Sequence, residues 1–187
     1  MKGKIAVLAG DGIGPEIMEE AVKVLNAVEE KFGLDFEFTD ALIGGAAFDK
    51  HGEHFPDVTR EICEGSDAIL FGSVGGPVGS KEKKWQACET NSILGVRKHF
   101  GFNINLRPVK TYKSLLGMCV LKPEVIGDGI DILTVRELSS GIYFGEHKLE
   151  KDNASDVMEY DRQTIEKVAH AAFKAAIKRR KKVSSID

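Results

Sequence analysis

The sequence predicts an α/β fold with a mixed sheet flanked by helices, and three patterns support that prediction. Residues 5–9 form a continuous apolar run, typical of a strand that is buried on both faces. A glycine-rich turn follows, and apolar residues then recur at helical spacing through about residue 31. Alternating apolar residues at 34, 36 and 38 indicate a second strand. The chain therefore opens as a β-α-β unit.

Local signals set the limits of the first helix. Pro15 suits the first helical position, because its missing N–H would have no partner there. Gly33 is expected to end the helix, since glycine readily adopts the left-handed conformation found at helix C-termini. The apolar face that should pack on the sheet consists of Ile17, Ala21, Val24, Leu25 and Val28.

Further elements are predicted along the rest of the chain. They are, in order, a short helix at 56–65, a buried strand at 68–71, a helix at 92–100, strands at 103–106 and 130–136, a strand or hairpin arm at 142–144, a helix after the N-cap Asp161, and the start of a strand at 183–186. The apolar face of the last helix consists of Ile165, Val168, Ala172, Phe173, Ala176 and Ile177. The pattern changes near residue 105, which predicts two domains, 1–104 and 105–187.

Composition restricts the class of protein. The 187 residues carry a formal net charge of −3, whereas a binder of nucleic acid or of acidic membranes should be basic. The three cysteines lack Cys-x-x-Cys spacing, which favours a reducing compartment over a disulfide framework or a zinc site. No apolar run approaches membrane-spanning length. We therefore expect a cytoplasmic protein with neither a membrane nor a nucleic-acid partner.

Three arginines stand within apolar segments: Arg97, Arg107 and Arg136, with Tyr143 shortly after the third. A buried arginine needs a partner anion, and its planar fork suits a carboxylate or phosphate. Glu137 is a poor partner for Arg136, because adjacent strand residues face opposite sides. Taken singly, each arginine has a structural explanation, such as a cation at a helix C-terminus. Together they predict a pocket for a small, multiply negative substrate.

The glycine-rich segments allow two interpretations. Residues 10–14 join a strand to a helix, but their spacing is not Gly-x-Gly-x-x-Gly, which favours a tight turn over a Rossmann dinucleotide motif. Asp35 is a weak candidate for a ribose contact. The loop at 72–84 is either an anion cradle or an ordinary exposed loop. Glu89 either contacts a cofactor sugar or occupies the first turn of a helix.

The basic run at 178–182 is best explained as the cationic C-terminus of the last helix, because the whole chain is acidic. The five histidines show no metal-ligand spacing, and no nucleophile–base pair is recognisable.

Several stretches carry a resemblance to a known family. They are 8–16 around Gly10-Asp11-Gly12-Ile13-Gly14, 72–77, Asn105-Leu106-Arg107-Pro108, 135–145 and 178–187. The chain resembles the N-terminal half of the β-decarboxylating dehydrogenases, the isocitrate/isopropylmalate dehydrogenase family, and most closely the isopropylmalate branch. Ser139 and Ser140 depart from the Thr-Gly usual in that branch.

The resemblance implies site residues. Arg97, Arg107 and Arg136 would bind the carboxylates of 3-isopropylmalate, Ile93 and Leu94 would receive its isopropyl group, and Tyr143 would be the acid that protonates the enol. Ile13, Gly76, Pro77 and Glu89 would border the NAD cofactor. The implied reaction is NAD-dependent oxidation with decarboxylation, assisted by Mg²⁺ or Mn²⁺.

The resemblance also implies that 1–104 belongs to the larger α/β domain and that 105–187 begins a dimerisation and substrate domain. The family's lysine and metal-binding aspartates would fall beyond residue 187, so we expect no metal ligands here and a truncated, inactive chain. The complete protein would be a homodimer. The alternative is a non-catalytic interaction module that pairs with a full-length subunit or a complementary half.

Overall fold

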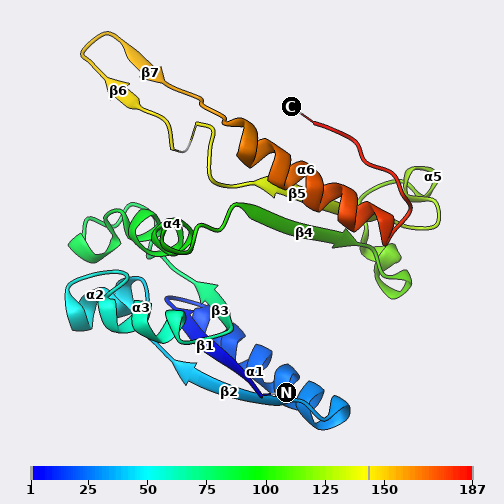
Figure 1. The fold of residues 1–187 in the computed structure, drawn as a ribbon, viewed down its shortest axis with the longest axis horizontal. Coiled ribbons are helices and arrows are strands. Elements are labelled where there is room, and N and C mark those ends of the chain that lie inside the picture. Colours follow the sequence, from blue (N-terminus) through cyan, green and yellow to red (C-terminus); the bar gives the residue numbers. More distant parts are fainter. Residues whose placement is uncertain (1, 143, 187) are drawn as a thin grey trace. The chain divides into compact units, whose positions relative to one another are not determined.

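The computed structural model describes residues 2–142 and 144–186, which fold as two compact units, 1–99 and 100–187. Figure 1 shows the order of the elements along the chain. The predicted α/β class is confirmed. Parallel and antiparallel strand pairs are both present, and they lie in separate sheets within the described residues. The domain limit predicted at 104/105 remains a prediction.

Unit 1 is built on a parallel sheet of three strands. The strands are β1 (Lys2–Gly10), β2 (Asp35–Asp40) and β3 (Ala68–Ser73), in the order β2-β1-β3. The helices are α1 (Gly14–Phe32), α2 (Gly45–His51), α3 (Asp57–Glu64), the 3₁₀ helix η1 (Lys83–Trp85), the π-helical η2 (Thr90–Leu94) and α4 (Gly95–Phe100). The predicted helix at 92–100 is thus a π turn followed by α4.

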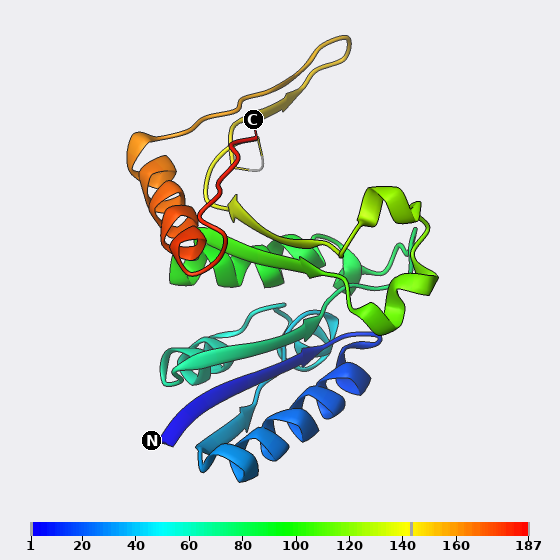
Figure 2. The ribbon, with the colours of Figure 1, turned by 90° about the vertical axis from the view of Figure 1, so that its right-hand side faces the viewer.

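The central strand β1 supplies the core of unit 1, as its continuous apolar run predicts. Ala6, Val7 and Leu8 are buried, because β2 and β3 pair with β1 on either side and helices cover the sheet. Figure 2 shows α1 running alongside β1 on one side of the sheet. Right-handed crossovers to β2 and back to β3 place α1 and the α2–α3 segment on opposite faces.

The start and end of α1 agree with the sequence prediction, but its buried face is shifted. Pro15 lies in the first turn, and Gly33 ends the helix with φ 64°. Met18 is buried, whereas Ile17 and Val24 are exposed, so the predicted face was partly wrong. These two residues lie at the edge of the apolar stripe, beyond the reach of the narrow three-stranded sheet.

Unit 2 contains two antiparallel strand pairs and a long helix. Its elements are β4 (Ile104–Lys110), η3 (Lys113–Met118), α5 (Pro123–Ile126), β5 (Asp131–Glu137), β6 (His147–Leu149), β7 (Ala154–Asp156) and α6 (Arg162–Ile177). β4 pairs with β5, and β6 pairs with β7. Asp161 caps α6 as predicted, accepting a hydrogen bond from the Thr164 N–H at 2.9 Å. Arg179 and Arg180, just past α6, bind Asp131 at the start of β5.

Two strand predictions in unit 2 were wrong. Ile142 and Phe144 lie in turns, because Gly141 adopts φ 81° and breaks the extended path; Tyr143 between them lies outside the described residues. Residues 183–186 have no regular structure, since no described strand pairs with them.

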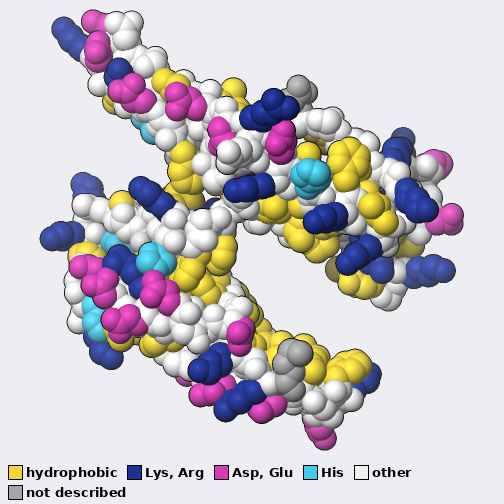
Figure 3. Space-filling view, viewed as in Figure 1, with side chains coloured by type: hydrophobic (Ala, Val, Ile, Leu, Met, Phe, Trp, Pro, Cys, Tyr) yellow, Lys and Arg dark blue, Asp and Glu magenta, His cyan; other side chains and the backbone are white. Residues whose placement is uncertain are grey.

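The predicted apolar face of α6 is largely exposed. Ile165, Phe173 and Ile177 are all exposed, and hydrophobic side chains are visible on the surface of this unit in Figure 3. The periodicity therefore identified a helix correctly, but the described part of unit 2 does not cover its apolar face. Among the described residues, no helix combines the length and the apolar character needed to cross a membrane.

The buried centre of β1 gives a test of this fold. Leu8 is 0% exposed, so Leu8→Ala should lower the free energy of unfolding by about 2–5 kcal/mol through lost burial and the cavity it leaves. Leu149→Ala is a matched control, because Leu149 is 88% exposed. Urea denaturation measures both; equal effects of the two changes would contradict the assignment of β1 as the core.

Candidate functional site

The glycine turn after β1 is held by the side chain of Asp11, which is only 6% exposed. Its Oδ1 accepts the Ala46 N–H at 2.8 Å, and its Oδ2 accepts the N–H groups of Gly45 at 2.8 Å and Gly75 at 3.1 Å. A carboxylate is favoured here because the N-terminus of a helix presents unpaired N–H groups and positive potential. One side chain therefore joins the end of β1, the start of α2 and the loop after β3.

The backbone of Asp11 strengthens the same junction. Its N–H donates to the Ser73 carbonyl at 2.6 Å, and the Ser73 hydroxyl donates to the Asp11 carbonyl at 2.9 Å. Gly10 precedes it with φ 77°, and a β-carbon there would lie 1.9 Å from the Ser73 oxygen. Only glycine allows this approach of β1 and β3.

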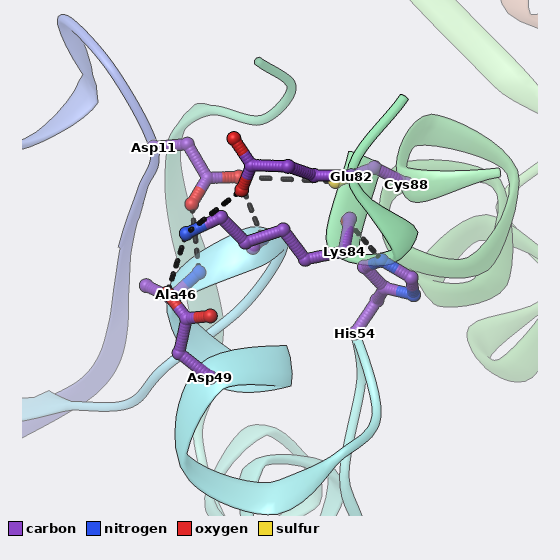
Figure 4. A network of polar contacts seen from close by, with 8 residues as sticks. Asp11, Ala46, Asp49, His54, Glu82, Lys84 and Cys88 are labelled. Atoms are coloured by element: carbon purple, nitrogen blue, oxygen red, sulfur yellow. Dashed lines mark hydrogen bonds and ion pairs between the residues drawn. The ribbon is translucent and has the colours of Figure 1, made fainter. Parts of the chain in front are cut away.

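A second group of contacts fixes the loop after β3 on α2 (Figure 4). Lys84 Nζ lies 2.9 Å from Asp49 Oδ2, a contact that raises the pKa of Lys84, and 3.8 Å from Glu82. The Lys84 carbonyl lies 2.6 Å from Nε2 of the buried His54. The Cys88 thiol lies 3.8 Å from Asp11 Oδ2, and its burial raises the thiol pKa.

Trp85 forms a wall at this edge of the sheet. A β-carbon at Gly76 or at Gly45 would lie 2.2 Å from the indole, so both glycines are needed for the ring to fit. Neither Asp11 nor Trp85 was assigned a role from the sequence. Asp11 lies in one of the motifs that carry the family resemblance, and that position was the available signal.

These elements line an open cavity of about 550 Å³ at the carboxyl end of the parallel sheet. Its lining includes all four residues that the resemblance assigns to the cofactor: Ile13, Gly76, Pro77 and Glu89. Asp11, Ser73 and Trp85 line it as well. A crevice beyond the carboxyl ends of parallel strands is where open α/β sheets bind ligands, and this volume suits a small molecule.

The structure disfavours the ribose role considered for Asp35. Asp35 pairs with Lys2 at the start of the parallel strands, whereas the glycine turn follows Gly10 at their opposite end. Glu89 instead lies in the cavity lining, and it also immediately precedes η2, so both interpretations of Glu89 agree with its position.

Three of the predicted substrate residues share one helical segment in unit 1. Ile93 and Leu94 end the π-helical η2, and Arg97 follows one turn later on α4. Residues three and four apart face the same side of a helix, so Arg97 lies next to both apolar side chains. All three are half-buried. π turns in helices are frequent at functional sites.

Two arginines lie on one face of the β4–β5 pair in unit 2. Arg136 pairs with Asn105, and Arg107 pairs with Thr134. Directly paired residues share a face, so both arginines lie on the same face of the strand pair. Arg107 is two residues from Asn105, the partner of Arg136, which makes the two arginines diagonal neighbours with β-carbons about 7 Å apart. Both are exposed, so the expectation that they are embedded was wrong: the apolar residues beside them alternate to the opposite face.

Glu137 has its own partners, as its poor fit to Arg136 predicts. Its carboxylate accepts the N–H and hydroxyl of Ser139 at 2.5 and 2.6 Å, and those of Ser140 at 3.0 and 2.7 Å. Partial burial raises the pKa of Glu137, but these four hydrogen bonds outweigh it and hold the pKa below its usual range. Arg136 therefore projects on one face of β5 while Glu137 is occupied on the other.

Arg97 belongs to unit 1 and the other two arginines belong to unit 2. Tyr143 lies outside the described residues. The described residues contain no group of three or more His, Cys, Asp and Glu side chains that could hold a metal ion.

The elements and the cavity define a class of protein: an α/β protein with a ligand-sized cavity at the carboxyl end of a parallel sheet. Residues 4–187 match the family model described as isocitrate/isopropylmalate dehydrogenase, and the chain belongs to that family.

Curated relatives are consistent with this membership. The chain is 51% identical to the 3-isopropylmalate dehydrogenases of Desulfotalea psychrophila and Campylobacter jejuni, with 98% of the chain and 53% and 51% of those relatives covered. The chain thus spans about half the length of the curated relatives it matches.

Solved structures show the same fold. The isocitrate dehydrogenase of Methylococcus capsulatus gives a TM-score of 0.75 at 25% identity, covering 96% of this chain and 49% of that one. A β-decarboxylating dehydrogenase of Thermococcus kodakarensis gives 0.65 at 31% identity, covering 94% of this chain and 46% of that one.

The role of Asp11 can be tested by Asp11→Asn. An amide presents N–H donors where three N–H groups need an acceptor, so the free energy of unfolding should fall by about 2–3 kcal/mol. Chemical denaturation measures the loss, and faster amide exchange at Gly45, Ala46 and Gly75 should accompany it. Asp35→Asn is the matched control; a loss as large as that of Asp11→Asn would refute the specific role.

The contacts of Glu137 predict a pH dependence. A folded pKa below the unfolded value, about 4.3, means that the contacts stabilise the fold above that pH, and that this stability is lost as pH falls through the folded pKa. Ser139→Ala with Ser140→Ala should raise the pKa of Glu137, seen by carboxyl NMR titration. The stability difference from the wild type should shrink below about pH 4. Ser155→Ala is the control, and an unchanged Glu137 titration in the double variant would contradict the assignment.

Proposed function

We propose that this chain binds NAD and 3-isopropylmalate for NAD-dependent oxidative decarboxylation, the leucine-biosynthetic reaction of the 3-isopropylmalate dehydrogenases it resembles. The observation that supports this most strongly is the cavity of unit 1. Four residues assigned to the cofactor from the resemblance come from three separate segments of the chain, and all four line it. The chain is also 51% identical to two relatives named 3-isopropylmalate dehydrogenase, which supports the same assignment.

The chemistry of the residues fits these ligands. NAD, when bound, accepts the hydride from the carbinol carbon. In unit 1, the cavity wall formed by Gly76, Pro77 and Trp85 would limit the position of the cofactor. Because β-carbons at Gly45 and Gly76 would clash with the indole, the cavity depends on two residues without side chains.

Each unit contains residues whose chemistry suits part of this substrate. Arg107 and Arg136, neighbours on one face, offer two forks for the carboxylates of a malate. The pair Ile93 and Leu94 offers apolar surface for an isopropyl group beside Arg97. On the resemblance, we assign Tyr143 as the acid that protonates the enol.

A divalent metal, Mg²⁺ or Mn²⁺, is part of the reaction that the resemblance implies. The described residues do not form a site for it. We therefore assign to this chain the binding and orientation of substrate and cofactor, and no step that involves the metal. We also propose that the protein acts as a cytoplasmic homodimer, which the exposed apolar face of α6 supports.

Trp85 provides a direct test of cofactor binding, because it is the one tryptophan of the chain and lines the cavity. NADH should quench its fluorescence in a saturable way, and NAD⁺ should compete. Glu89→Gln removes a carboxylate from the cavity and should weaken binding by about tenfold, as expected for loss of one charged hydrogen bond. Glu53→Gln, at an exposed position outside the cavity, is the matched control.

The absence of saturable quenching by either nucleotide would refute the cofactor assignment. Equal effects of the two substitutions would refute the role of Glu89. Calorimetric titration with 3-isopropylmalate tests the substrate assignment separately, and formation of NADH from 3-isopropylmalate and NAD⁺ with Mg²⁺ tests turnover by the chain itself.

A further inference from the structure

One polar atom on the face that carries Arg107 and Arg136 has no partner among the described residues. The Oδ1 of Asn105 is buried and accepts no hydrogen bond. Leaving a buried acceptor without a donor is unfavourable, and such atoms are rare in folded proteins. An orphaned acceptor at a candidate site therefore indicates a donor that reaches it in the working state.

The strand register places a suitable donor beside Asn105. Asn105 on β4 is paired directly with Arg136 on β5, so both side chains project from the same face. β-carbons of directly paired residues lie about 4.5–5.5 Å apart, well within reach of an arginine side chain. The pairing is held in place beyond its end, where the Leu138 N–H donates to the Asn103 carbonyl at 3.0 Å.

The acid next to Arg136 in the sequence does not compete for this role. Glu137 faces the opposite side of β5, and four hydrogen bonds from Ser139 and Ser140 occupy its carboxylate. A guanidinium has five N–H donors, and a bidentate carboxylate uses two of them. Arg136 can therefore donate to Asn105 and still present its fork to a carboxylate.

We propose that Asn105 is a positioning residue for Arg136: its Oδ1 accepts a hydrogen bond from the guanidinium and thereby orients the arginine fork toward a substrate carboxylate. The substrate part of this inference rests on the proposed function. The restraint on Arg136 is a property of β4 and β5 and does not depend on it. Asn105 acts through Arg136 and has no chemical step of its own.

The first test measures the arginine itself in the ligand-free protein. Rotation of the Arg136 guanidinium, measured by NMR of its Nε and Nη groups, should be slow in the wild type and faster in Asn105→Leu, which keeps the size and removes the acceptor. Asn105→Asp keeps an acceptor and should preserve the slow rotation. Asn153→Leu, in the turn between β6 and β7, is the matched control and should leave Arg136 unchanged. Equal rotation in the wild type and Asn105→Leu would overturn the proposal, whether or not substrate binds.

The second test is a double-mutant cycle on the affinity for 3-isopropylmalate. Asn105→Leu should weaken binding by about tenfold, as for one lost hydrogen bond. In the Arg136→Lys background the same change should have no further effect, because Asn105 acts only through that arginine. Additive effects would show that Asn105 acts independently and would overturn the positioning role. A wild-type chain that does not bind 3-isopropylmalate would instead refute the proposed function, while the rotation measurement would still decide whether Asn105 restrains Arg136.

Discussion

The buried carboxylate of Asp11 is the constraint on which the rest of unit 1 depends. It stands at the end of the central strand and accepts N–H groups from the start of α2 and from the loop after β3. Three segments that are far apart in the sequence are thereby fixed around one cavity. Because the negative charge meets the positive end of a helix, the arrangement satisfies both partners at once. The edge of the fold that borders the cavity is thus held by a residue whose own role is structural.

In unit 2, two positively charged side chains lie side by side on one sheet face. The β4–β5 register puts Arg107 and Arg136 on one face, where an anion would stabilise both positive charges. The carboxylate next to Arg136 in the sequence, Glu137, accepts hydrogen bonds from Ser139 and Ser140 on the other face. The strand geometry already separates Glu137 from Arg136, and the hydrogen bonds from Ser139 and Ser140 hold Glu137 on its own face. The proposed function assigns this arginine pair to the carboxylates of the substrate.

The exposed apolar residues of α6 form a surface that a partner could cover. The helix has a clear apolar stripe, yet Phe173 and Ile177 are exposed in the described part of unit 2. Polar contacts hold both ends of the helix. Asp161 caps its start, and Arg179, just past its C-terminus, binds Asp131. A rigid helix with an uncovered apolar face is typical of an interaction surface, which agrees with the proposed homodimer.

The sequence by itself determined the elements whose signals are local: the run at 5–9, the breaks at Pro15 and Gly33, and the cap Asp161. It also identified the family, through motifs that match in order. Only the tertiary structure decided that Ile13, Gly76 and Glu89 border one cavity, that Arg107 and Arg136 share a face, and that Asp11 joins three segments. The wrong predictions have the same origin. Strands were expected at 142–144 and 183–186, and the arginines were expected to be embedded. Each of these predictions depended on segments distant in the sequence that would pair with the strands or cover the arginines. Local periodicity carries no information about such distant partners.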